Sequence, residues 1–152
     1  MNKNSFLLIL GGILSFCAAI FQAVIAFVPA WSAAFGASDA LVSNPALLIT
    51  LGLLVALLLV IFGLYGLSGA GVIRRLPLLR LGLFVIGLLY SLVGINFIFQ
   101  ALAMLGILPS TGPIPIYQVL ISFGAFVAAL AYLIGLAVSW KRLSSKPAPA
   151  VS

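Results

Sequence analysis

The chain has 152 residues, of which 65% are apolar and only 5% are charged: seven are Lys or Arg and one is Asp. Soluble domains carry about 25% charged residues, so this composition excludes a soluble globular domain and indicates an all-α integral membrane protein. The net charge of +6 does not indicate a nucleic-acid partner, because the basic residues stand at the ends of apolar stretches and form no dense basic arm.

The residue inventory also excludes most catalytic and metal chemistry. The chain has no His, one Cys and one acidic residue. Structural zinc, haem and iron–sulfur sites need several such ligands, and the single Cys17 cannot form an internal disulfide. Paired carboxylates or a His for acid–base catalysis are missing too. We therefore expect no cofactor and no enzymatic activity, and a lipid-modifying enzyme that uses Arg or Tyr is the least favoured alternative.

Four apolar stretches are the predicted membrane spans, at residues 6–28, 46–73, 81–108 and 116–140. As helices they are about 34 to 42 Å long, enough to cross a hydrocarbon core of about 30 Å. Lys3 and the apolar run after it also resemble a secretion signal, but the run is long for a signal and we expect a retained helix. The sequence predicts one transmembrane domain over 1–143 and a disordered tail over 144–152.

The basic residues lie at alternate ends of these stretches, and all agree with one orientation: Lys3, then Arg74, Arg75 and Arg80 between the second and third stretches, then Lys141, Arg142 and Lys146. The positive-inside rule therefore predicts cytoplasmic N- and C-termini and a multi-pass protein of the inner (cytoplasmic) membrane. Arg74, Arg75 and Arg80 are also candidate contacts for anionic lipid head groups, although setting the topology accounts for them equally well.

The connection between the first two stretches contains a helix start. In Ser43-Asn44-Pro45, Asn44 or Ser43 can cap the second helix and Pro45 suits its first turn. The segment before it, residues 29–43, is semi-apolar, and we expect it to lie against the membrane surface. Asp39 is predicted to cap a short helical turn there.

Small residues recur at steps of three, four or seven in every stretch, and membrane helices use such positions to approach closely. This spacing favours left-handed crossings near 20°. The predicted fold is a compact antiparallel four-helix bundle with packing positions that include Ser15, Gly52, Gly63, Gly66, Gly94 and Gly124.

Uncharged polar side chains gather at similar depths in the outer half of the predicted bundle: Gln22, Thr50, Asn96, Gln100, Gln118 and Ser122. An unpartnered amide in hydrocarbon is costly, so the amides should point inward or toward another chain. One interpretation is interhelical hydrogen bonding. The other is a small polar cavity, open to the outside, for a lipid head group, a quinone-like molecule or a small uncharged solute. Tyr65, Tyr90 and Tyr132 lie deeper and could extend such a cavity or simply pack.

The arginine-rich segment at residues 73–80, IRRLPLLR, connects the second and third stretches. With this segment, the chain resembles, over nearly its whole length, uncharacterised four-span bacterial inner-membrane proteins with an Arg-rich central loop. The resemblance is architectural and compositional, and it implies no activity. The chain lacks the membrane-embedded Glu of small multidrug exporters, the paired Cys of quinone-linked disulfide oxidases and the haem His of b-type cytochromes.

Taken together, these features predict a non-catalytic accessory or assembly subunit that acts by helix packing with a protein partner or with itself, surrounded by membrane lipids. The alternative is an oligomeric transport or permeation protein for small solutes or lipids that uses an outer-leaflet polar cavity. Charge within a span usually marks coupled transport, and no charged residue lies within the four apolar stretches.

Overall fold

The protein is described here by a computed structural model that covers residues 3–109 and 114–144, and its regular elements in that part are helices. The long helices are α1 (Lys3–Ala26), α4 (Pro45–Ala70), α5 (Leu79–Met104) and α6 (Ile116–Ser144). Two short helices, α2 (Pro29–Ala34) and α3 (Asp39–Val42), connect α1 to α4. Within the described residues, four helices are long and apolar enough to cross a membrane, so this is a multi-pass membrane protein.

Helix α4 begins where the sequence predicts and ends earlier. The Asn44 side chain accepts a hydrogen bond from the Leu47 N–H at 3.2 Å, and Pro45 is the first helical residue. The helix was expected to continue to residue 73. It ends at Ala70 because Gly71 adopts a left-handed conformation with φ of 82°, a common way to end a helix.

The other long helices also differ from the predicted spans at their ends. Helix α1 covers 3–26 where 6–28 was predicted, and α5 covers 79–104 where 81–108 was predicted. Helix α5 ends early because the chain turns at Gly106, whose φ is 73°. Helix α6 continues to Ser144, and the rest of the tail predicted to be disordered lies outside the described residues.

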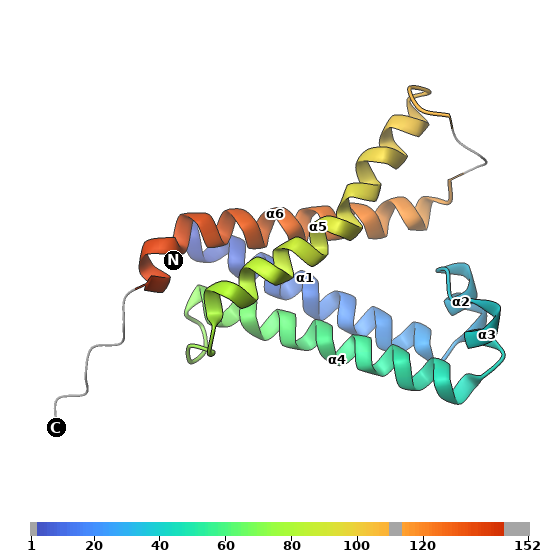
Figure 1. Cartoon of the computed structure of the whole chain (residues 1–152), viewed down its shortest axis with the longest axis horizontal. Helices are drawn as coiled ribbons and strands as arrows, with labels where there is room; N and C mark the ends of the chain where they lie inside the picture. The colour runs from blue at the N-terminus through green and yellow to red at the C-terminus, as the bar shows by residue number, and fades with distance from the viewer. Residues whose placement is uncertain (1–2, 110–113, 145–152) are drawn as a thin grey trace.

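The long helices form two closely packed pairs, α1 with α4 and α5 with α6, and α6 also packs on α1 (Figure 1). Contact between α4 and α5 is much smaller, and the C-terminal half of α5 diverges from the other helices (Figure 1). Helix α5 is the least buried span and α6 the most buried. The arrangement is therefore less compact than the small-residue spacing predicted.

The two ends of the molecule carry different elements. One end holds the start of α1, the connection between α4 and α5, and the end of α6 (Figure 1). We call it the arginine end, because Arg74, Arg75 and Arg80 belong to that connection and to the first turn of α5. We call the opposite end, which holds α2 and α3, the Asp39 end.

Helices α1 and α4 cross through glycines. A Cβ atom added to Gly66 would lie 2.9 Å from the backbone of Gly12, and one added to Gly12 would lie 3.1 Å from the carbonyl oxygen of Gly63. Helices α5 and α6 approach in the same way, since a Cβ at Gly94 would lie 2.6 Å from the Cα of Phe126. Small residues thus permit the close backbone contacts on which membrane helix pairs depend.

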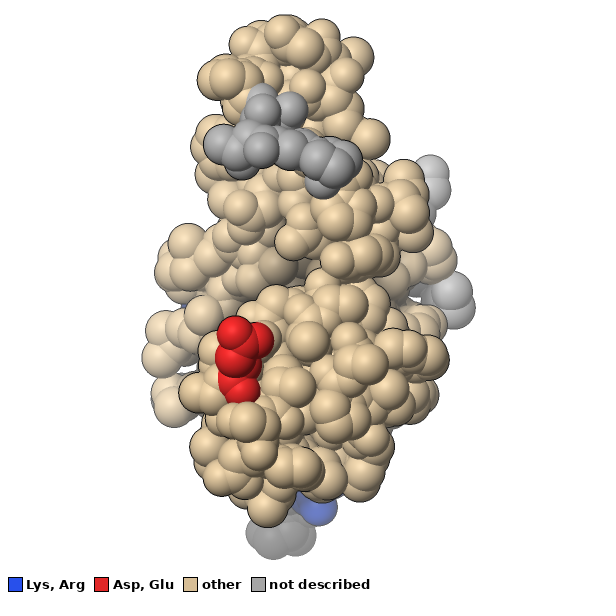
Figure 2. All heavy atoms as spheres, turned by 90° about the vertical axis from the view of Figure 1, so that its right-hand side faces the viewer, with Lys and Arg blue, Asp and Glu red and all other residues tan. Residues whose placement is uncertain are grey.

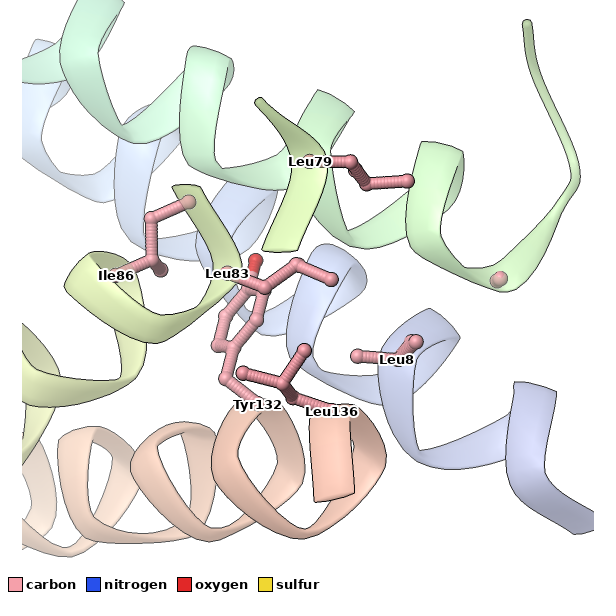
Figure 3. Packing of buried hydrophobic residues seen from close by; sticks show 7 residues of the cluster. Leu8, Leu79, Leu83, Ile86, Tyr132 and Leu136 are labelled. Atoms are coloured by element: carbon pink, nitrogen blue, oxygen red, sulfur yellow. The ribbon is translucent and has the colours of Figure 1, made fainter. Parts of the chain in front are cut away.

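The main apolar core lies in the half of the molecule nearer the arginine end. Leu8 of α1, Leu83 of α5 and Tyr132 of α6 are fully buried. Figure 3 shows these side chains together with Ile86 and Leu136. The long helices are therefore held most firmly in this half.

The crossing at Gly66 leads to a stability prediction. In Gly66→Ala the new methyl group meets the backbone of Gly12, which cannot rotate away as a side chain would, so we expect a loss of about 1–3 kcal/mol. Gly124→Ala is the matched control, because a Cβ at Gly124 has no neighbour within 4 Å. Thermal unfolding of the detergent-solubilised protein measures both, and equal midpoints would contradict the close crossing.

Candidate functional site

Three hydroxyl groups meet about midway along the spans. The Tyr90 hydroxyl of α5 donates to Ser15 Oγ of α1 at 2.9 Å, and Ser15 Oγ lies 2.9 Å from the Tyr132 hydroxyl of α6. Tyr132 donates in turn to the carbonyl oxygen of Phe62 in α4 at 2.8 Å. Ser15 Oγ also donates to the carbonyl of Gly11 at 3.0 Å, and either hydroxyl can be the donor between Ser15 and Tyr132. This hydroxyl cluster, Ser15, Tyr90 and Tyr132, therefore connects all four long helices.

Aromatic packing supports the hydroxyl cluster. The Tyr90 and Tyr132 rings are stacked, with centroids 5.8 Å apart and an interplanar angle of 9°. The Phe62 ring meets Tyr90 edge-on at 6.0 Å. In Figure 3 the Tyr132 ring projects from α6 among apolar side chains with its hydroxyl oxygen directed away from α6. A buried hydroxyl without a partner is costly, so these bonds fix how the helices are rotated against one another.

A cavity of about 740 Å³ lies beyond the hydroxyl cluster, toward the Asp39 end. Tyr90 belongs to its lining, together with Val93 of α5. The remaining walls are single faces of α1, α4 and α6, whose lining residues are spaced three or four apart. On α4 they are Leu48, Leu51, Gly52, Val55 and Leu59, and on α6 they are Ile121, Gly124, Ala125 and Ala128.

The segment that contains α2 and α3 closes the cavity at the Asp39 end. Ser32 is buried and donates to the carbonyl of Ile25 at 2.7 Å. The Phe35 ring meets the Tyr117 ring of α6 edge-on at 4.9 Å, and the Tyr117 hydroxyl donates to the carbonyl of Ala34 at 2.8 Å. The segment is thus a lid attached to both α1 and α6, and its place against the membrane surface stays a prediction.

Asp39 lies in the lid but does not cap a helix. The predicted short turn is present as α3, which begins at Asp39, but its N-cap is Ser38 and no side chain caps it. Figure 2 views the molecule from the Asp39 end, where the single acidic residue forms a red patch on a surface that shows almost no Lys or Arg. The acidic and arginine-rich parts are therefore at opposite ends.

No protein-family model, curated protein or solved structure matches this chain. Conclusions about its function therefore depend on the geometry of its cavity and surfaces. In the part of the chain that the structure describes, the cavity lining carries the Gln22 amide, the Ser32 and Tyr90 hydroxyls and the Cys17 thiol, and no charged side chain. Such a lining suits an apolar molecule with one neutral polar group.

The polar residues predicted to form one cluster are not gathered around this cavity. Of the six, Gln22 alone lines it. Gln22 is half-buried, and its amide forms no hydrogen bond with another described residue. Thr50, Asn96 and Gln118 are exposed, and Ser122 is buried outside the cavity lining.

The hydrogen bonds of the other predicted polar residues are local. The Thr50 hydroxyl donates to the carbonyl of Ala46 in its own helix at 2.8 Å, and the Asn96 amide donates to the carbonyl of Val93 at 3.2 Å. Gln100 differs, because its Oε1 is buried and has no hydrogen-bond partner among the described residues. Neither Asn96 nor Gln100 is thus held by a polar contact with another described span.

The three arginines predicted to contact lipid have different environments. Arg74 and Arg75 are exposed, whereas Arg80 is half-buried. The Arg80 guanidinium lies 4.6 Å from the centroid of the Trp140 ring and donates to the Trp140 carbonyl at 3.1 Å, which attaches the start of α5 to the end of α6. The buried Ser68 hydroxyl donates to the carbonyl of Arg74 at 2.9 Å and fixes the connection between α4 and α5.

The hydroxyl cluster leads to a second prediction. Ser15→Ala removes the atom that Tyr90 and Tyr132 share, and leaving buried hydroxyls without this partner should cost about 1–3 kcal/mol. Ser91→Ala is the control, because the Ser91 hydroxyl donates only within its own helix, to the carbonyl of Gly87 at 2.8 Å. Equal losses of thermal stability in the two variants would show that the cluster does not hold the helices together.

Proposed function

We propose that this protein is a non-catalytic accessory or assembly subunit of the inner (cytoplasmic) membrane that acts by helix packing with a protein partner or a second copy of itself. The observation that carries the proposal is the diverging half of α5. It belongs to the least buried span and bears the exposed amide of Asn96 within that span.

Asn96 lies in the middle of an exposed helix surface. Leu92, Ile95, Asn96 and Phe99 are spaced three or four residues apart and are all exposed, with Leu92 at 63% and Phe99 at 54%. We call these four residues the α5 face. Positions spaced in this way form the contact stripe of helices that pack on one another. The α5 face is therefore suited to another helix.

The amide makes contact with another helix more favourable than contact with lipid alone. The single hydrogen bond found for the Asn96 side chain among the described residues is to the carbonyl of Val93 in its own helix. Lipid hydrocarbon cannot form hydrogen bonds with the second N–H or the side-chain carbonyl oxygen of Asn96, and a polar group without a partner there is costly. Hydrogen bonds between membrane helices are worth about 0.6 kcal/mol on average, so Asn96 adds register and modest affinity to apolar packing.

The charge distribution supports the orientation within this proposal. Arg74, Arg75 and Arg80 lie at one end and Asp39 at the other. By the positive-inside rule, the arginine end and both termini are cytoplasmic, and consecutive spans alternate in direction as an antiparallel bundle. The exposed Arg74 and Arg75 then meet the anionic head groups of the cytoplasmic leaflet. The α5 face lies in the outer leaflet.

The alternative of transport or permeation has less support. A polar pathway needs polar side chains along it, and the cavity lining includes Gln22 but none of Thr50, Asn96, Gln100 or Gln118. We therefore favour helix packing over the passage of a polar solute.

Asn96→Leu tests this proposal. Because Asn96 is exposed and its one side-chain hydrogen bond among the described residues is within its own helix, we expect unchanged thermal stability and a loss of association of about threefold, as for one interhelical hydrogen bond. Native mass spectrometry in gentle detergent measures the amount of partner or second copy that the full chain retains.

Thr50→Val is the matched control, since Thr50 is exposed and its hydroxyl is satisfied within α4. The control should retain its partner as the unmodified chain does. A wild-type chain that is monomeric and carries no partner, or an Asn96→Leu variant with full association, would overturn the proposal.

A further inference from the structure

The cavity beyond the hydroxyl cluster is bounded on several sides by apolar side chains. Leu14 of α1, Leu59 of α4 and Ala128 of α6 line its deep part, and Phe35, Ala37 and Leu41 of the lid segment line its other end. Its volume of about 740 Å³ is within the range of about 300–1,000 Å³ that ligand sites occupy. An apolar cavity is a poor site for water. If it stayed empty, its walls would lose dispersion contacts.

Gln22 supplies the amide of this lining, whereas the Ser32 and Tyr90 hydroxyls already have hydrogen-bond partners. It is half-buried, lines the cavity within span α1, and forms no hydrogen bond with another described residue. An amide in such a place is costly unless a polar group meets it. The amide carries two N–H donors and a carbonyl acceptor, so an occupant with a polar oxygen at this level would satisfy it.

The shape of the cavity sets the form of the occupant. From Gln22 to Leu14 the cavity follows α1 for eight residues, about 12 Å of helix. From Gln22 toward the lid it reaches Ala26, about 6 Å further along α1. The longer part runs toward the hydroxyl cluster and is lined mainly by apolar side chains, among them Leu14, Ala18 and Leu59. It fits an unbranched hydrocarbon chain whose polar group stops at Gln22.

Access is from the side, between α4 and α5. These helices touch nearer the arginine end, where Gly82 lies against the Tyr65 ring and Phe62 against Tyr90. Beyond Tyr90 they separate, and Val55 of α4 and Val93 of α5 are both cavity-lining and exposed. A chain from the surrounding bilayer can thus enter between these helices without crossing the lid.

We propose that this cavity binds an ester-linked acyl chain of a membrane lipid, with the ester carbonyl oxygen accepting a hydrogen bond from the Gln22 amide and the chain extending toward Tyr90. An ester fits better than a free fatty acid because no Lys or Arg among the described residues lines the cavity, and a carboxylate buried without a counter-charge is strongly disfavoured. The site is distinct from the α5 face, so its test does not depend on any protein partner.

Photocrosslinking of the full chain tests the proposal. The probe is a phosphatidylcholine with a diazirine on one acyl chain, diluted into vesicles of unlabelled phosphatidylcholine that contain the protein. Adducts mapped by peptide mass spectrometry should concentrate on the less exposed cavity-lining residues Leu14, Leu59 and Ala128. Adducts on the lipid-facing Ile20, which is 67% exposed and outside the cavity lining, serve as the internal reference for ordinary contact with the bilayer.

Gly124→Leu fills the cavity, because a Cβ at Gly124 has no neighbour within 4 Å and the residue lines the cavity. We expect cavity adducts to fall about tenfold relative to the Ile20 adducts. Ala137→Leu adds a leucine at an exposed position of the same helix outside the cavity lining and should leave them unchanged. Gln22→Met keeps the side-chain length but removes the amide. It should lower the cavity adducts about three- to tenfold relative to the Ile20 adducts.

The native cysteine provides a test that needs no cavity-filling variant. Cys17 lines the cavity and is exposed, so hexyl methanethiosulfonate would attach a short chain inside it and should suppress the cavity adducts. Cys17→Ser is the unreactive control. Adducts that survive both Gly124→Leu and the Cys17 modification would overturn the site. Equal or stronger labelling by the matching diazirine fatty acid would overturn the ester assignment.

Discussion

The hydrogen-bonded chain from Tyr90 through Ser15 and Tyr132 to the carbonyl of Phe62 is the interaction on which the arrangement of the spans depends. Lipid is as apolar as the helix surfaces, so the hydrophobic effect does little to hold membrane helices together. Close packing and buried hydrogen bonds have to do so instead. This chain includes one group from each long helix, and it fixes their rotation at one level of the membrane.

That level divides the molecule into two unlike halves. Toward the arginine end, leucines fill the core, Gly66 lets α1 and α4 touch backbone to backbone, and Arg80 attaches α5 to Trp140. Toward the Asp39 end, α5 moves away from α4, and a cavity remains under the lid. One half is suited to holding the spans together, and the other to contact with other molecules.

Much of this architecture can be predicted from the sequence, because it is local. Apolar length predicts four helices, and Asn44 marks the start of α4. That Gln22 lines the cavity and Asn96 is exposed could not be predicted, because a sequence gives depth along a helix but not the rotation of the helix around its axis. The small-residue spacing predicts Ser15 only as a position where helices pack closely. One feature of the sequence is consistent with its contact with Tyr90 and Tyr132. All three residues lie 11 or 12 residues from the end of their helix that is at the arginine end.

The segment of α5 just beyond Tyr90 contributes to two surfaces at once. Val93 lines the cavity, whereas Leu92 and Asn96 belong to the α5 face on the outside. A helix turn is rigid, so a displacement that widens the cavity also reorients the exposed face. Any two molecules that contact these surfaces and favour different positions of the segment are therefore thermodynamically linked, and each changes the affinity of the other by the same factor.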